Sequence, residues 1–313
     1  FLRSLLFFSL TIFVFSCSKK DKWIEVDPAF SKYIDAYTTG TISKTSAVRI
    51  KLAADAKTTH AVGEAVKESL FDISPSVKGK AYWLDARTIE FKPETWLKPD
   101  QLYEVNFKLG KVTKTESKFS DFKFSMKTVT PSFIVNDGGL RASGVKNKMS
   151  LSGFLETADV ENGKEVEKLL TAFQNNKTLK IDWQHNDASK SHRFTIENID
   201  RLKSASSIEL RWDGKPMNMS PRGENIIAIP AQGDFKVLDV VPVNDAQQYA
   251  SVQFSDMIAI GQDLNGLISI SGQYGLKLAL RQFQQTQDPY VKINLARGLI
   301  GQRSQVKMAS QAI

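Results

Sequence analysis

Residues of the types that most often act as nucleophiles or metal ligands are scarce in this chain of 313 residues. It holds one cysteine, Cys17, and three histidines, His60, His185 and His192. Cys17 closes an apolar run that begins at Leu5 and follows a single positive residue, Arg3. This pattern is typical of a signal peptide. The run is too short for a membrane-spanning helix, which needs about 20 apolar residues.

The four residues that end the run, Val14-Phe15-Ser16-Cys17, look like a bacterial lipobox. In such a motif the chain is cleaved before the cysteine, which then carries lipid. Phe15 is bulkier than the motif prefers. The interpretation predicts a signal peptide over 1–17, lipidation at Cys17, and a lipid-anchored protein of the cell envelope that faces the periplasm or the cell surface. The alternative is a buried N-terminal strand or helix whose thiol fills core space.

The histidines do not predict a metal site. No carboxylate or second histidine stands at ligand spacing from any of them, and His185 and His192 flank a loop of turn formers, which predicts a solvated hairpin tip. A second cysteine for a zinc site is missing from the sequence. The sequence also has no G-x-S-x-G, G-x-G-x-x-G or Walker motif. We therefore expect no catalytic residues, no metal, no cofactor and no enzymatic activity, although the members of a Ser/His/Asp triad would meet only in space.

Four tryptophans lie in or beside strand-like segments. They are Trp83, Trp96, Trp183 and Trp212. Sandwich cores need large side chains of this kind, so we expect all four to be core residues. A platform on which carbohydrate rings stack is the alternative.

Net charge argues against a nucleic-acid partner. The formal charge is +8, of which residues 1–20 contribute +3 and residues 281–313 contribute +4. The 260 residues between them are close to neutral and show no basic stripe. The electrostatic pattern of a nucleic-acid binder is therefore absent. We also expect no small-molecule substrate.

The polar segment 18–40 is expected to be a tether, and from Thr41 the sequence has the pattern of short strands. Residues 47–52 alternate apolar and polar side chains, which indicates a half-buried strand. Residues 80–84 and 88–91 flank a short hairpin connection. About seven such segments over 41–130 predict an antiparallel Ig-like or macroglobulin β-sandwich.

A second sandwich is expected over 131–234, with one inserted helix. Its strands are predicted near 149–155, 179–183, 193–196, 208–212 and 226–230. The helix is predicted from the spacing of Val160, Val166, Leu169, Leu170 and Phe173, with Thr157 or Asp159 as N-cap.

A third sandwich opens at Phe235 and is expected to be incomplete over 235–280. Residues 250–256 can be aligned with 47–53, and 266–272 with 70–75, as a weak internal repeat. Beyond residue 280 the strand plan of the first unit does not recur, and residues 281–313 hold seven glutamines and one acid. We interpret this segment as an aberrant tail that follows a break in the reading frame. The alternative is a natural disordered tail.

Two sets of segments resemble the N-terminal part of bacterial alpha-2-macroglobulin-like lipoproteins of the Bacteroidetes type. The first set is 73–79, 83–93 and 97–103, and the second is 235–240, 252–256 and 262–268. The resemblance covers about 18–280. It implies tandem macroglobulin sandwiches in a protease trap, whose bait is cleaved before the chain collapses around the protease.

This sequence departs from the family plan at two points. Some members capture the protease through a Cys–Gln thioester, but the one cysteine here is Cys17. The later domains that would hold a bait are also missing from the sequence. The resemblance therefore implies the membrane-anchored N-terminal fragment of an endopeptidase inhibitor, with the membrane and, in the full-length family context, proteases as partners. The alternative is an Ig-like cell-envelope lipoprotein that binds a protein or glycan.

Overall fold

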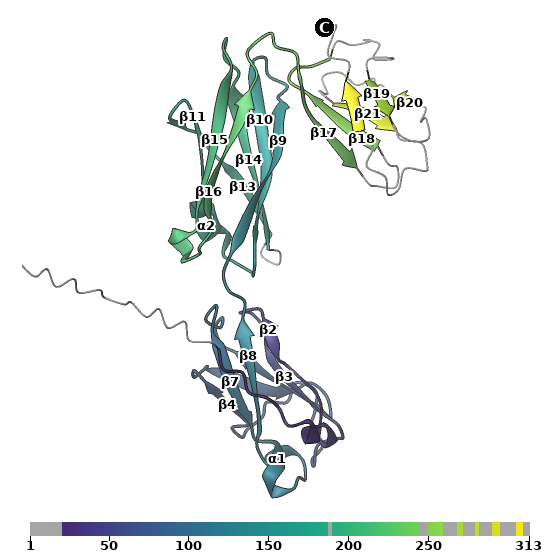
Figure 1. Ribbon diagram of the computed structural model, residues 1–313. Helices are drawn as coiled ribbons and strands as arrows, with labels where there is room; N and C mark the ends of the chain where they lie inside the picture. Colours follow the sequence, from purple (N-terminus) through teal and green to yellow (C-terminus); the bar gives the residue numbers. More distant parts are fainter. Residues whose placement is uncertain are drawn as a thin grey trace, which may run out of the picture. The chain divides into compact units, whose positions relative to one another are not determined.

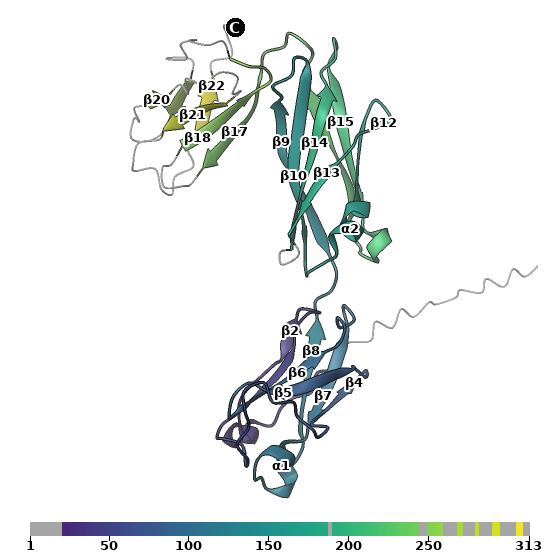
Figure 2. The same ribbon diagram turned by 180° about the vertical axis from the view of Figure 1, so that it is seen from behind.

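The computed structural model describes residues 21–186, 190–243 and 249–258, and four further strands at 268–271, 279–281, 290–294 and 305–308. The chain forms two compact units that divide between Val129 and Thr130 (Figures 1 and 2). Both are built mainly from antiparallel strands, as the sequence predicts, and the fold is a series of β-sandwiches. The predicted signal peptide, with Cys17, lies outside the described residues.

Unit 1 contains two four-stranded sheets. One has the order β1 (Ile34–Tyr37), β3 (Val48–Leu52), β6 (Thr88–Pro93), β5 (Gly79–Trp83), and the other β2 (Gly40–Ile42), β8 (Phe122–Thr128), β7 (Leu102–Phe107), β4 (Phe71–Ser74). All pairings are antiparallel except that of β2 with β8. Three short helices complete the unit: η1 (Pro28–Lys32), α1 (Leu109–Val112) and η2 (Ser117–Phe119).

Apolar and polar side chains alternate along these strands, which explains why one face of each sheet is buried. Val48, Ile50 and Leu52 of β3 are fully buried, and the residues between them are exposed or half-buried. Side chains from both sheets, such as Ile89 of β6 and Phe124 of β8, belong to one core. Because successive strand residues point to opposite faces, this pattern requires one buried and one solvated face on each sheet.

Part of the segment expected to be a tether belongs to the folded unit. β1 pairs with β3, and Ile34 is buried. Phe30 of η1 packs edge-on against the rings of Phe119 and Phe122, with centroids 5.0 and 4.9 Å away. Burial of these apolar side chains fixes a segment whose polar composition alone predicts a linker.

Unit 2 begins with a second sandwich. One sheet has the order β13 (Asp182–His185), β14 (Ser191–Asp200), β10 (Lys148–Thr157), β9 (Phe133–Ala142), and the other β12 (Lys177–Thr178), β11 (Leu170–Gln174), β15 (Ser206–Asp213), β16 (Arg222–Ile229). Side chains of both sheets share one core, to which Leu151, Phe194 and Leu210 belong. Strands β10, β14, β15 and β16 contain nearly all of the segments predicted for them, and β14 and β16 are longer than predicted. The strand predicted over 179–183 begins only at Asp182, and β9 and β11 were not predicted as strands.

The helix predicted in this sandwich is present but much shorter than its spacing indicates. It is α2 (Gly163–Val166), followed by η3 (Glu167–Leu169), and a further turn, η4 (Lys215–Met217), lies after β15. Its N-cap is Asn162, whose side-chain oxygen accepts from the N–H of Lys164 at 2.9 Å, so Thr157 and Asp159 are not the cap. Leu170 and Phe173 belong to strand β11, because pairing with β15 satisfies their backbone groups.

After the second sandwich, the described residues form six further strands. β17 (Val237–Val243), β18 (Tyr249–Phe254), β21 (Tyr290–Asn294) and β20 (Ala279–Arg281) form one sheet, and β19 (Ile268–Ser271) pairs with β22 (Gln305–Met308). β21 and β22 lie in the stretch interpreted as a tail. A break in the reading frame near residue 280 stays a prediction.

Candidate functional site

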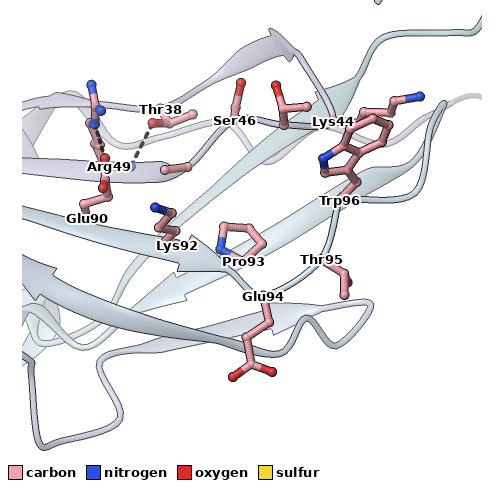
Figure 3. A pocket seen from close by; sticks show the side chains of 12 residues that line it. Thr38, Lys44, Ser46, Arg49, Glu90, Lys92, Pro93, Glu94, Thr95 and Trp96 are labelled. Atoms are coloured by element: carbon pink, nitrogen blue, oxygen red, sulfur yellow. Dashed lines mark hydrogen bonds and ion pairs between the residues drawn. The ribbon is translucent and has the colours of Figure 1, made fainter. Parts of the chain in front are cut away.

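Unit 1 carries an open groove at one end of the sheet that contains β3 and β6 (Figure 3). Its volume is about 730 Å³. Two loops form its walls, the first over 43–47 before β3 and the second over 94–96 after β6. The lining residues are Thr38, Lys44, Thr45, Ser46, Ala47, Arg49, Glu90, Lys92, Pro93, Glu94, Thr95 and Trp96.

The local sequence fixes both loops. Strand β6 ends at Pro93, whose nitrogen cannot donate to a neighbouring strand. Four residues later Leu97 is buried in the core, and its N–H donates to the carbonyl oxygen of Lys44 at 2.9 Å. The first loop is closed by a turn in which the N–H of Ser46 donates to the carbonyl of Ser43 at 3.0 Å. The Leu97–Lys44 hydrogen bond therefore joins the two walls.

Trp96 projects from the second wall into solvent. Its side chain is 53% exposed, whereas its neighbour Leu97 is 3% exposed. The ammonium group of Lys44 lies 4.9 Å from the centre of the indole, and Lys44 itself is buried. A cation in this position over a tryptophan ring is attracted by the ring electrons. The indole is therefore a large apolar surface that is held in place before any ligand arrives.

Charges on the floor of the groove come from the outer face of the sheet. Arg49 of β3 and Glu90 of β6 are cross-strand partners and form an ion pair, with Nε and Oε2 2.6 Å apart. Lys92 follows two residues after Glu90, so it lies on the same face. It is exposed, and it makes no ion pair within the described residues. Figure 3 shows Glu94 directed away from Lys92 and Trp96.

The expectation that all four tryptophans belong to the core is wrong for Trp96. Trp83 is 2% exposed and belongs to the core of unit 1. Trp183 and Trp212 are half-buried and pack against the core of unit 2. Leu97, and not Trp96, occupies the buried position of this segment, because consecutive residues of an extended segment point in opposite directions. The sequence Pro93-Glu94-Thr95-Trp96-Leu97 contains this signal.

His185 and His192 lie at the base of the predicted hairpin, whose tip residues 187–189 lie outside the described residues. They are direct cross-strand partners on β13 and β14, and their Nδ1 atoms lie 3.0 Å apart. His192 is 1% exposed. The missed residue is Glu167 in η3, whose Oε1 lies 3.1 Å from Nε2 of His185. The short helix covers the pair, and its position could not be read from the spacing of the histidines.

The hydrogen bonds assign the protons of this cluster. An ionised Glu167 carboxylate can only accept, so His185 donates from Nε2 and its Nδ1 accepts from Nδ1–H of His192. Nε2 of His192 is then a buried acceptor for which the described residues provide no partner. Burial, and next the nearby His185, lower the pKa of His192. Hydrogen bonds from Lys164 and His185 lower the pKa of Glu167.

The expectation that no carboxylate stands at ligand spacing from a histidine is wrong for His60, because Glu64, four residues later, contacts its ring. Nδ1 of His60 lies 3.3 Å from Oε1 of Glu64, and the imidazole ring stacks on Trp83 with centroids 4.1 Å apart. Among the described residues, no group of three or more histidine, cysteine, aspartate or glutamate side chains could hold a metal ion. Within the same residues, no helix is both long and apolar enough to cross a membrane.

No protein-family model matches the sequence, and no curated protein matches it significantly. Solved structures align with it at low similarity. The surface-layer protein SbsC, domains 1–6, is 11% identical with a TM-score of 0.36, and the alignment covers 89% of this chain and 40% of that one. Mouse nectin-like molecule 4, an ectodomain of Ig domains, is 11% identical with a TM-score of 0.27, covering 82% and 87%.

An L,D-transpeptidase from Mycobacterium tuberculosis is 12% identical with a TM-score of 0.23, covering 50% of this chain and 61% of that chain. The chain thus spans less than two thirds of the transpeptidase and of the surface-layer fragment. None of these likenesses assigns an activity to it.

Proposed function

We propose that the chain is the envelope-anchored, non-enzymatic N-terminal part of an alpha-2-macroglobulin-like endopeptidase inhibitor. The observation that carries this proposal is the serial construction of unit 2, in which a new sheet begins directly after the second sandwich. β16 ends at Ile229 and β17 begins at Val237. The segments that resemble the family contain all of β6, overlap β4 and β7 in unit 1, and overlap β17 and β18 in unit 2. Residues 262–267 of the last segment lie outside the described residues.

A buried arginine joins the second sandwich to the sheet that follows it. Arg201 lies just after β14 and is 3% exposed. Its guanidinium donates to the carbonyl of Ala231 at 3.0 Å in the connection, and to the carbonyl of Ser255 at 3.0 Å and the carboxylate of Asp256 at 2.8 Å after β18. Further acceptors are the carbonyls of Pro230 and Asp234. A buried side chain that joins one sandwich to the next sheet supports a role in a longer chain of connected sandwiches.

The test is entrapment by the natural protein in which this chain continues into later domains. After incubation with an endopeptidase and size-exclusion chromatography, the protease should elute with the inhibitor and still cleave a small chromogenic peptide. Elution of free protease, or co-elution of an inactive one, would contradict a trap. Translation of the downstream DNA in its three frames should show whether the strand pattern continues.

Anchoring is the second part of the proposal. Cys17 would carry lipid, and the membrane would be the first partner of the chain at the cell envelope. Acyl chains contribute about 0.8 kcal/mol per buried CH₂ group, so two or three chains give a stable anchor. Proteases would be partners only of the full-length inhibitor.

A second candidate function has its own observation in its favour. The chain could act as an Ig-like envelope lipoprotein that binds a partner through unit 1, because the groove presents the exposed Trp96 between two fixed loops. Protection of residues 43–47 and 94–96 from hydrogen exchange on addition of envelope polysaccharide or protein fractions would support it. Protection confined to other segments would contradict it.

A further inference from the structure

The groove of unit 1 has the dimensions and rigidity of a ligand site. Its volume of about 730 Å³ falls within the range of small-molecule pockets, about 300–1,000 Å³. The Leu97–Lys44 hydrogen bond and the buried side chain of Leu97 hold the two walls together. A ligand would therefore meet groups that are already in place, so little ordering entropy is lost on binding.

Trp96 supplies an apolar surface that is flat and more than half open. Trp96 remains 53% exposed although the ammonium group of Lys44 lies 4.9 Å from the centre of its ring. A rigid aromatic surface of this kind is suited to stacking against another flat apolar face. The C–H face of a pyranose ring is one such surface.

The groups beside Trp96 favour a negatively charged ligand with many hydroxyl groups. Glu90 is paired with Arg49, and the side chain of Glu94 is directed away from Lys92 and Trp96, which leaves Lys92 as an exposed cation on the floor. Hydroxyl groups line the walls at Thr38, Thr45, Ser46 and Thr95. Lysine attracts a carboxylate as a compact point charge, and serine and threonine hydroxyls both donate and accept hydrogen bonds.

The sheet topology argues against an extended peptide as the occupant. Peptides commonly bind by adding a strand to an exposed sheet edge. β3 lies between β1 and β6, and β6 lies between β3 and β5, so both strands beneath the groove are already paired on both sides. The groove thus offers side chains but no free backbone ladder.

We propose that this groove binds an acidic oligosaccharide, with Trp96 stacked on a sugar ring and Lys92 paired with a carboxylate of the same glycan. The inference rests on the partner-binding function given above as the second candidate. It adds the chemical class of the ligand and the two side chains that select it.

Titration calorimetry on the full chain tests this assignment with three probes of similar length: an oligogalacturonate hexamer, neutral maltohexaose, and a hexaglutamate peptide. The oligogalacturonate should bind best, and more weakly as salt is raised. Trp96→Ala should weaken the affinity for the oligogalacturonate about tenfold. Trp23→Ala, which removes an exposed tryptophan outside the groove, should leave this affinity unchanged. Lys92→Ala should weaken it several-fold, while Lys123→Ala on the opposite sheet should not.

Several results would overturn the assignment. These are no binding of the oligogalacturonate, equal losses in Trp96→Ala and Trp23→Ala, equal binding of maltohexaose, or equal binding of hexaglutamate. Circular dichroism of each variant checks that unit 1 is folded. If fractions of other chemistry still protect residues 43–47 and 94–96 from exchange, the partner-binding function stands and the acidic-saccharide assignment alone fails.

Discussion

At the scale of single residues, the environment of His185 and His192 is set by contacts between segments that are distant in the sequence. His185 and His192 were visible as a pair, but only the register of β13 and β14 places their Nδ1 atoms 3.0 Å apart. The short helix then covers them, and Gly163 packs so closely on the ring of His185 that a Cβ would overlap it. Burial of His192 depends on this tertiary contact, which no local pattern contains.

The stability of unit 2 should fall as the pH drops below about 6.5. The pKa of His192 is lowered from 6.5 in the folded state, so the unfolded chain takes up a proton first and its free energy falls relative to that of the folded state. The pKa of Glu167 is also lowered, from 4.5, so its contribution is lost only at lower pH. Urea unfolding between pH 7.5 and 5.5 should show a flatter pH dependence in His192→Leu than in the wild type.

The control is His60→Leu in unit 1, which should leave the pH dependence of unit 2 unfolding unchanged. An identical slope for wild type and His192→Leu would show that another group causes the loss of stability in acid.

Cys17 gives the second prediction at this scale. Cys17→Ser should move the protein from the membrane fraction to the soluble fraction of the envelope and abolish labelling by radioactive palmitate, because the thiol is the proposed site of lipid attachment. Ser16→Ala keeps a small residue before the cysteine and should remain labelled. Labelling of Cys17→Ser would place any lipid elsewhere.

At the scale of elements, period-two alternation predicted the strands well, because each sheet buries one face. β3, β7 and β10 follow this rule along most of their length. The helix was predicted too long because Leu170 and Phe173 fit a helical spacing and a strand equally well over so few residues. Pairing of β11 with β15 decided between them, and that pairing joins segments 40 residues apart. The groove was missed because it is formed by two loops rather than by a periodic element.

A glycine in the middle of β10 gives the third prediction. Gly153 lies directly opposite Phe194 on β14, whose ring folds over it. A Cβ at Gly153 would overlap that ring and the carbonyl oxygen of Asn136 on β9, so Gly153→Ala should lower the free energy of unfolding by about 2 kcal/mol. Gly144→Ala is the matched control, because nothing lies within 4 Å of its added Cβ, and it should change stability by less than about 0.5 kcal/mol. Equal effects in urea unfolding would contradict the close approach.

At the scale of the whole molecule, the sequence predicted the order of sandwiches but not how they are joined. Arg201 sits in a polar stretch that resembles an ordinary loop. Its guanidinium group joins the two parts through hydrogen bonds to acceptors that are 29 to 55 residues away in the chain. A residue of this kind is found only once the strands on both sides of it are in place.

Arg201→Met should loosen this joint. The carbonyls of Pro230, Ala231, Asp234 and Ser255 would lose a charged donor, so the unfolding free energy should fall by about 3 kcal/mol. Hydrogen exchange should rise in residues 231–236 and 255–258. Arg222→Met, which removes a side chain that is 67% exposed in its ion pair with Asp213, should change stability by less than about 1 kcal/mol. Unchanged exchange in Arg201→Met would show that the joint does not depend on this side chain.

If this chain is the anchored first part of a protease trap, as we propose, the inhibitor should discriminate between substrates by their size. The natural full-length protein is incubated with an endopeptidase, and cleavage of a chromogenic peptide and of a large protein substrate is measured. A trap excludes only large substrates, so we expect peptide cleavage to stay near its uninhibited rate while protein cleavage falls at least about tenfold. Equal inhibition of both substrates, or inhibition of neither, would contradict the account.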